Sequence, residues 1–115
     1  MDTSTEILDR KLDVISKEKE ENSLEIQTLK RTEVELDDFK QRASRLFDWI
    51  LSTNHRDPRE FHYLEFARID TENQVRNYFF EVEDEKERLY LKRKKLYDAE
   101  EAVYHEKKIL NMEEA

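Results

Sequence analysis

The sequence contains no glycine, no cysteine and only one proline, Pro58. Tight turns, phosphate-binding loops and dinucleotide-binding loops rely on the backbone freedom of glycine, so the patterns that build those sites are missing. The lack of cysteine excludes disulfides, thiol catalysis and cysteine-ligated zinc. There is no run of roughly 18 apolar residues such as a membrane-spanning helix needs. The first residues also lack the basic-then-apolar order of a secretory signal. A composition of this kind suits long helices.

Charge dominates what is present. Of the 115 residues, 43% are charged and 37% are hydrophobic, which predicts one domain with a thin core. The net charge of -8 comes from 21 basic and 29 acidic residues, and an acidic surface repels nucleic-acid phosphates. The basic run Lys92–Lys95 points around the whole circumference of a helix and has glutamates within one turn. We therefore interpret this run as surface ion pairs and expect no nucleic-acid partner.

Two long stretches of the sequence place an apolar residue at almost every seventh position. In the first stretch six of seven such positions are apolar, the exception being Asn22; they are Leu8, Ile15, Leu29, Leu36, Ala43 and Ile50. In the second stretch seven of eight are apolar, the exception being Arg68; they are Phe61, Val75, Val82, Leu89, Leu96, Val103 and Leu110. A seven-residue repeat held this long predicts supercoiled helices.

A helix start separates the two stretches. Asp57, Pro58 and Glu60 have the spacing of an N-cap, a proline at the first helical position and a carboxylate three residues after the cap. Thr3 and Glu6 have the same cap-to-carboxylate spacing at the start of the chain.

These signals predict one all-α domain over residues 1–115, an elongated antiparallel two-helix hairpin. The helices are expected at about residues 4–52 and 58–112, with the turn at about 53–57. A further helix start at Asp70 would break the second helix near residues 68–74, and this alternative stays open. The antiparallel register expected from the turn gives, to within about one turn of helix, the pairs Leu8–Leu110, Leu29–Leu89, Leu36–Val82 and Ile50–Phe61, with a one-heptad drift or a stutter expected near the tip.

A second, aromatic row accompanies the heptad repeat of the C-terminal stretch. Tyr90, Tyr97 and Tyr104 each follow an apolar heptad residue directly, so they lie about 100° around the helix from it. Further aromatic residues that one seam cannot bury are Phe47, Trp49, Phe79 and Phe80. We interpret these seven residues as a surface for a partner helix. In the alternative interpretation, the tyrosine rings lie flat on the hairpin with their hydroxyls in water.

The chemistry of a catalytic or metal site is weakly represented. The histidines and carboxylates near the turn are metal-ligating types, but their spacing matches no established motif; they are His55, Asp57, Glu60 and His62. Carboxylate pairs are expected by chance among 29 acidic residues, and two helices alone offer no pocket that excludes water. We expect no enzymatic activity, no metal, no cofactor, no small-molecule substrate and no insertion into a membrane.

The C-terminal half, "YFFEVEDEKERLYLKRKKLYDAEEAVYHEKKIL", and the position of Trp49 near the turn carry a family resemblance. The chain resembles the small WXG-type (ESAT-like) helical hairpins of bacterial type VII secretion. It is more similar to the helical accessory proteins encoded beside LXG-domain toxins in Gram-positive bacteria. Ile50 and Leu51 follow Trp49, so W-x-G is absent, and the arms are longer than in the smallest WXG-type proteins. Both departures favour the accessory group.

The resemblance implies a non-enzymatic targeting factor or chaperone that binds the helical LXG domain of a toxin in the cytoplasm. A second small WXG-like protein often joins such a complex, and whether this chain is exported with the toxin stays open. Export motifs of the family pair an aromatic residue with an acidic one four positions later. Phe80 and Asp84 match F-x-x-x-D, and Tyr97 and Glu101 match a relaxed form. The alternative function is a structural coiled coil that homodimerises and has no client.

Overall fold

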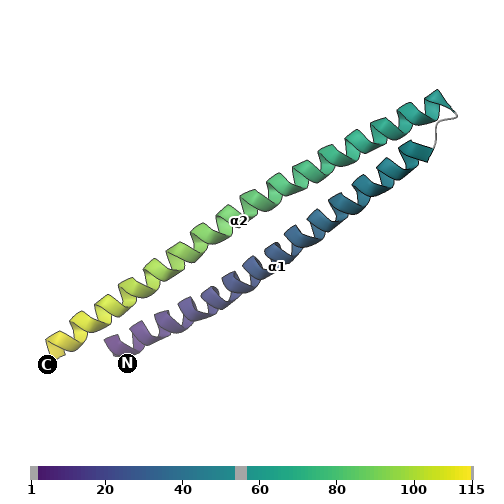
Figure 1. The fold of residues 1–115 in the computed structure, drawn as a ribbon. Helices are drawn as coiled ribbons and strands as arrows, with labels where there is room; N and C mark the ends of the chain where they lie inside the picture. The colour runs from purple at the N-terminus through teal and green to yellow at the C-terminus, as the bar shows by residue number, and fades with distance from the viewer. Residues whose placement is uncertain (1–2, 54–56, 115) are drawn as a thin grey trace. The chain divides into compact units, whose positions relative to one another are not determined.

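The computed structural model describes residues 3–53 and 57–114, and these residues form two α-helices and no strand. Helix α1 spans Ser4–Thr53 and helix α2 spans Pro58–Glu114 (Figure 1). The all-α prediction is confirmed. Helix α2 runs without a break through residues 68–74, so the alternative helix start at Asp70 is wrong. The Asp70 carboxylate instead accepts a hydrogen bond of 3.1 Å from the side chain of Gln74, one turn further along the same helix.

Both helix starts are capped as the sequence predicts. The hydroxyl of Thr3 accepts a hydrogen bond of 3.2 Å from the backbone N–H of Glu6. The carboxylate of Asp57 accepts one of 2.9 Å from the backbone N–H of Arg59, and Pro58 lies between them at the first helical position. Each cap satisfies one of the N–H groups that a helix start leaves without an intrahelical acceptor.

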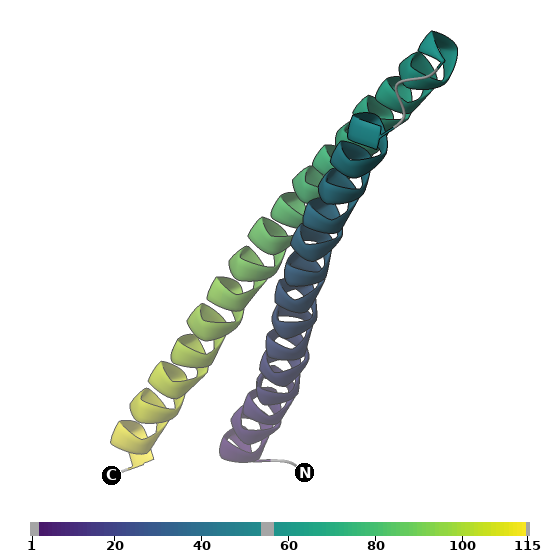
Figure 2. The same cartoon turned by 45° about the vertical axis from the view of Figure 1, so that its right-hand side comes forward.

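The chain divides into two compact units, one formed by Met1–Thr28 with Lys86–Ala115 and the other by Leu29–Glu85. In the first unit the start of α1 lies beside the end of α2 and runs antiparallel to it (Figures 1 and 2). Ion pairs join the two segments there, with Asp9 at 2.6 Å from Lys107 and Lys19 at 3.0 Å from Glu100. In the second unit the end of α1 and the start of α2 form the antiparallel pair.

The buried side chains follow the seven-residue repeat. In the first unit they include Leu8, Ile26, Leu89, Leu96 and Val103, and in the second unit they include Leu51, Val75 and Val82. Most members of this set stand at the heptad positions read from the sequence, so the repeat correctly identifies the side of each helix that packs. The core of each unit is a single seam, as the low apolar content predicts.

Asn22 is the polar member of this seam. Its side chain is only 1% exposed, and its Nδ2 donates a hydrogen bond of 3.0 Å to the backbone carbonyl of Leu89. The predicted register holds to within about one turn, since Lys19 pairs with Glu100 and Asp9 with Lys107. Asn22 interrupts the apolar repeat, and a buried acceptor satisfies its side chain.

Candidate partner-binding surfaces

The tyrosine row lies on the first unit and is partly open to solvent. The side chains of Tyr90, Tyr97 and Tyr104 are 37%, 44% and 55% exposed, while the heptad residues that precede them are buried. The row therefore flanks the seam without belonging to it, as the sequence predicts. Half-exposed rings in line along a helix give an apolar band that a further helix can cover.

Tyr97 differs from the other two tyrosines because cations cover its ring. The Nζ of Lys19 lies 4.2 Å from the ring centroid, and the guanidinium carbon of Arg93 lies 5.7 Å from it. Lys19 also donates to both carboxylate oxygens of Glu100, at 3.2 and 3.0 Å. Within the described part of the chain, no such ring contact involves Tyr90 or Tyr104. Tyr97 thus helps hold the two segments of this unit together.

The sequence did not predict the cluster formed by Lys19, Arg93, Tyr97 and Glu100. In the sequence, Lys19 is one of the polar residues that interrupt the first heptad stretch. Its long methylene stem lies in the seam, and its ammonium group reaches Glu100 at the edge. About a quarter of each side chain is exposed, 26% for Lys19 and 24% for Glu100. A lysine at a heptad position opposite a glutamate is the signal that identifies such a pair.

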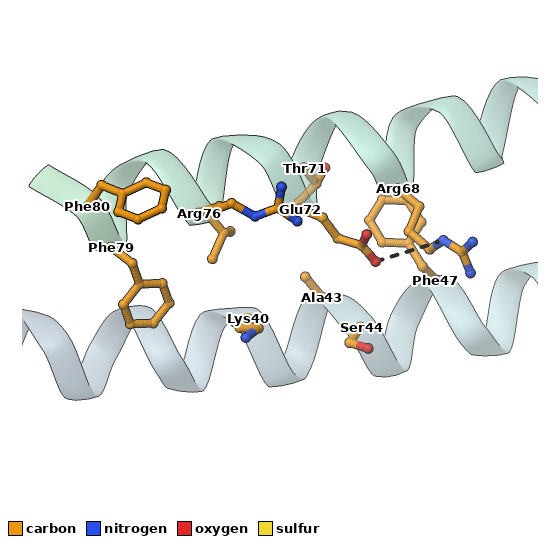
Figure 3. A pocket seen from close by; sticks show the side chains of 11 residues that line it. Lys40, Ala43, Ser44, Phe47, Arg68, Thr71, Glu72, Arg76, Phe79 and Phe80 are labelled. Atoms are coloured by element: carbon orange, nitrogen blue, oxygen red, sulfur yellow. Dashed lines mark ion pairs between the residues drawn. The ribbon is translucent and has the colours of Figure 1, made fainter.

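A groove with a volume of about 440 Å³ opens between α1 and α2 within the unit Leu29–Glu85. Helix α1 lines it with Lys40, Ala43, Ser44 and Phe47, and helix α2 lines it with Arg68, Thr71, Glu72, Val75, Arg76, Phe79 and Phe80. Figure 3 shows the methyl side chain of Ala43 between the rings of Phe47 and Phe79. The two rings are half-buried and Phe80 is exposed. A small residue at a seam position between two aromatic residues leaves the space unfilled.

The polar rim of this groove is mainly basic. Arg68 forms two long ion pairs. Its Nη2 lies 3.5 Å from Glu65, and its Nε lies 3.9 Å from Glu72, the pair drawn in Figure 3. The Nε atom is buried and has no hydrogen-bond partner among the described residues. Lys40 lies over the ring of Phe79, with its Nζ at 5.8 Å from the centroid.

The predicted partner residues are divided between the two units. The three tyrosines belong to the first unit, and Phe47, Trp49, Phe79 and Phe80 belong to the second. Trp49 is exposed near the end of α1, and its backbone carbonyl accepts hydrogen bonds from the hydroxyls of Ser52 and Thr53. Their assignment to a partner stays a prediction.

The export-motif candidates lie on the surface of α2. Phe80 and Asp84 are both exposed, one turn apart. In the relaxed match Glu101 is exposed, whereas Tyr97 has the two cations over its ring. An anchor for another protein needs a ring that is free to be covered, so Phe80 with Asp84 is the better-placed pair.

Residues 3–53 and 57–114 provide neither a membrane span nor a metal site. No helix there is long and apolar enough to cross a membrane. No three histidine, aspartate or glutamate side chains are grouped in that part of the chain so that they could hold a metal ion. Of the four metal-ligating candidates near the turn, His55 lies outside the described residues, and Asp57 caps α2.

A family model described as "Protein of unknown function (DUF3958)" matches residues 3–110 of the chain. The match covers almost the whole sequence, so the chain belongs to this family. No curated protein and no solved structure was found to be similar to the chain.

Proposed function

We propose that this member of the DUF3958 family is a non-enzymatic adaptor that binds a helical client, namely the N-terminal LXG domain of a type VII secretion toxin. The observation that carries the proposal is the tyrosine row, Tyr90, Tyr97 and Tyr104, which stays 37–55% exposed beside a seam that is already packed. A row of solvent-exposed aromatic residues along one helix is a surface on which a further helix can pack.

The two helices leave the apolar surface of the tyrosine row unpacked. Two helices bury one seam each, and here that seam is occupied by Leu89, Leu96 and Val103. The tyrosine row lies about 100° further around the helix, where only a third helix can pack against it. Aromatic side chains are among those that contribute most to protein interfaces, because they bury a large area at a small entropic cost.

The identity of the client rests on the resemblance of the C-terminal half to the accessory proteins of LXG toxins. In the proposed role the chain binds the toxin in the cytoplasm, with or without a second small WXG-like protein. It then brings the toxin to the secretion machine.

The proposal is tested by producing the full chain together with the LXG domain of the toxin encoded beside it. A complex that survives size-exclusion chromatography and gives a measurable Kd by calorimetry supports the function. The LXG domain of a toxin from a different locus serves as the specificity control. If the chain and its neighbouring LXG domain elute separately at micromolar concentrations, both alone and with the other small proteins of the locus added, the proposed client is wrong.

The alternative is a structural coiled coil that pairs only with itself. It is favoured by the exposed aromatic side chains near the turn, Trp49, Tyr63 and Phe66, which a second copy can cover. Light scattering on the purified chain distinguishes the two functions. A tight homodimer that protects all three tyrosines of the row from solvent favours the structural function, and a monomer that binds the LXG domain favours the adaptor.

A further inference from the structure

We infer that the groove between Ala43 and Val75 is the specificity pocket of the adaptor, and that it receives a large apolar side chain from an acidic helix of the client. This inference rests on the proposed function, since it names the chemistry of the client segment. It concerns the unit Leu29–Glu85 alone and does not depend on the tyrosine row.

The shape of the groove indicates a bulky apolar anchor. Ala43 stands at a seam position where larger residues would fill the space, and the rings of Phe47 and Phe79 close the gap on either side (Figure 3). The volume of about 440 Å³ is within the range of about 300–1,000 Å³ found for ligand pockets. Pockets with aromatic walls of this kind are where single anchor residues contribute most of the affinity of an interface.

The charge of the rim indicates an acidic neighbour for that anchor. Lys40, Arg68 and Arg76 surround the groove against one carboxylate, Glu72, although the chain as a whole carries a net charge of -8. Among the described residues Arg76 is exposed and has neither a hydrogen bond nor an ion pair, whereas Arg68 is paired with Glu65 and Glu72. A carboxylate from outside can therefore pair with Arg76 at the rim.

Helical geometry allows one segment to supply both groups. A helix that packs along the groove between α1 and α2 can insert an aromatic or large aliphatic residue beside Ala43. A Glu or Asp three or four positions away on the same face then lies one turn further along, at the basic rim. An acidic amphipathic helix is therefore the occupant that matches the apolar wall and the charge together.

A second copy of this chain fits the groove less well. In a two-fold symmetric dimer centred on this groove, Lys40, Arg68 and Arg76 would face their own counterparts. Like charges brought together in an interface oppose association.

The test uses the full chain as bait for a displayed library of short helical peptides with randomised surface positions. The expected result is enrichment of peptides that combine a large apolar residue with Glu or Asp within one turn. Three variants are then compared with the parent by titration with the best peptide. Ala43→Phe fills the groove, Arg76→Glu reverses a charge on its rim, and Arg45→Glu makes the same charge change at an exposed position of α1 that does not line the groove.

Filling the groove or reversing the rim charge is expected to weaken peptide binding by at least about tenfold, while Arg45→Glu changes it less than about twofold. Binding of the parent should also weaken as NaCl rises, and this dependence should shrink in the Arg76→Glu variant. A larger residue at position 43 can disturb the seam, so circular dichroism is used to check that both groove variants remain folded. If Ala43→Phe does not fold, the comparison of Arg76→Glu with the parent still tests the inference.

Enrichment of basic or uncharged peptides, no enrichment at all, or equal loss in Arg76→Glu and Arg45→Glu would overturn the inference. The same variants titrated with the neighbouring LXG domain separate it from the proposed function. If the LXG domain binds the parent and all three variants equally, the adaptor function holds and the groove is not its pocket. If acidic peptides bind through the groove but the LXG domain does not bind at all, the pocket stands and the client is wrong.

Discussion

Asn22 donates a hydrogen bond from its side-chain Nδ2 to the backbone carbonyl of Leu89, at 3.0 Å, from a position that is 1% exposed. The surrounding seam is built from apolar residues that repeat every seven positions, so sliding one segment past the other by a heptad keeps apolar residues in contact. The acceptor is a backbone carbonyl, and a slide by one heptad would bring an equivalent carbonyl to Asn22. The hydrogen bond therefore satisfies the buried amide, which would be costly to leave unpaired, without selecting between those registers.

We therefore expect Asn22→Leu to stabilise the fold and keep its register. Burying an apolar side chain in place of the amide should raise the free energy of unfolding by about 1–2 kcal/mol. Spin labels at the exposed positions 16 and 94 report the register, and one narrow distance peak is expected in both the parent and the variant. A loss of register would add a second population, shifted by about 10 Å along the helix axis, the length of one heptad.

Ser23→Leu, at the exposed neighbouring position, is the matched control and should change neither the unfolding midpoint nor the distance peak. A second peak in the Asn22→Leu protein would show that Asn22 itself sets the register.

The sequence contains enough to predict the two helices and the side on which each one packs. The caps at Thr3 and Asp57 are local signals, since the capping side chain and the N–H it accepts from are at most three residues apart. The heptad repeat is likewise a property of one helix at a time. For these reasons the repeat alone identifies Val75, Val82 and Leu89 as buried positions, and all three are buried.

The pocket could not be predicted in the same way because it depends on both helices together. The turn gives the register to within about one turn of helix, and this does not say which side chain of α2 faces a given residue of α1. The groove is lined by Ala43 on α1 and Val75 on α2, together with the rings of Phe47 and Phe79. The small residue is visible in the sequence, whereas the residue across from it is known only once the register is fixed.

Asp57→Ala should destabilise the fold by about 1 kcal/mol, the usual cost of losing an N-cap. Its carboxylate accepts the N–H of Arg59 at 2.9 Å, and alanine offers no acceptor. For a chain of this length the loss corresponds to a fall of roughly 4 °C in Tm, measured by circular dichroism. Asp57→Asn retains an oxygen acceptor and should recover most of the stability. Equal losses in the two variants would mean that the cap does not account for the effect.

Lys19 and Glu100 should show a favourable coupling energy of roughly 1 kcal/mol in a double-mutant cycle. Their 3.0 Å ion pair is partly buried, with about a quarter of each side chain exposed, so salt should weaken it less than a pair in full solvent. Alanine at each position and at both gives the four proteins of the cycle, and urea unfolding at low and high NaCl gives the energies. The exposed pair Arg42–Asp38 is the comparison, and a smaller, more salt-sensitive coupling is expected there.

Asp84→Asn should leave binding of the LXG domain intact and reduce export of the toxin, if Phe80 and Asp84 form the export motif. Both residues are exposed one turn apart on α2, and the substitution removes a charge with almost no change in shape. The measurement is the amount of toxin in the culture medium relative to the cells, beside a pull-down from the cells. Glu81→Gln removes a charge from a neighbouring exposed residue and serves as the control. Normal export with Asp84→Asn would show that Phe80 and Asp84 do not form an export motif.

Replacing Tyr90 and Tyr104 by serine should leave the isolated protein as stable as the parent and weaken its binding to the LXG domain. The two rings are 37% and 55% exposed and flank the seam, so their loss removes no buried contact comparable to that of Leu89. At an interface each lost aromatic contact costs on the order of 1–3 kcal/mol, which together corresponds to a change in Kd of at least about thirtyfold.

Tyr97→Ser should behave differently, because the ammonium of Lys19 lies 4.2 Å from its ring centroid. Cation–π contacts at partly exposed sites contribute about 0.5–1 kcal/mol, so this variant should lower the free energy of unfolding as well as the affinity. Circular dichroism melts and calorimetry with the LXG domain separate the two effects. If all three replacements lowered the stability equally and left the affinity unchanged, the tyrosine rings would serve to cover the hairpin. The partner surface would then lie elsewhere.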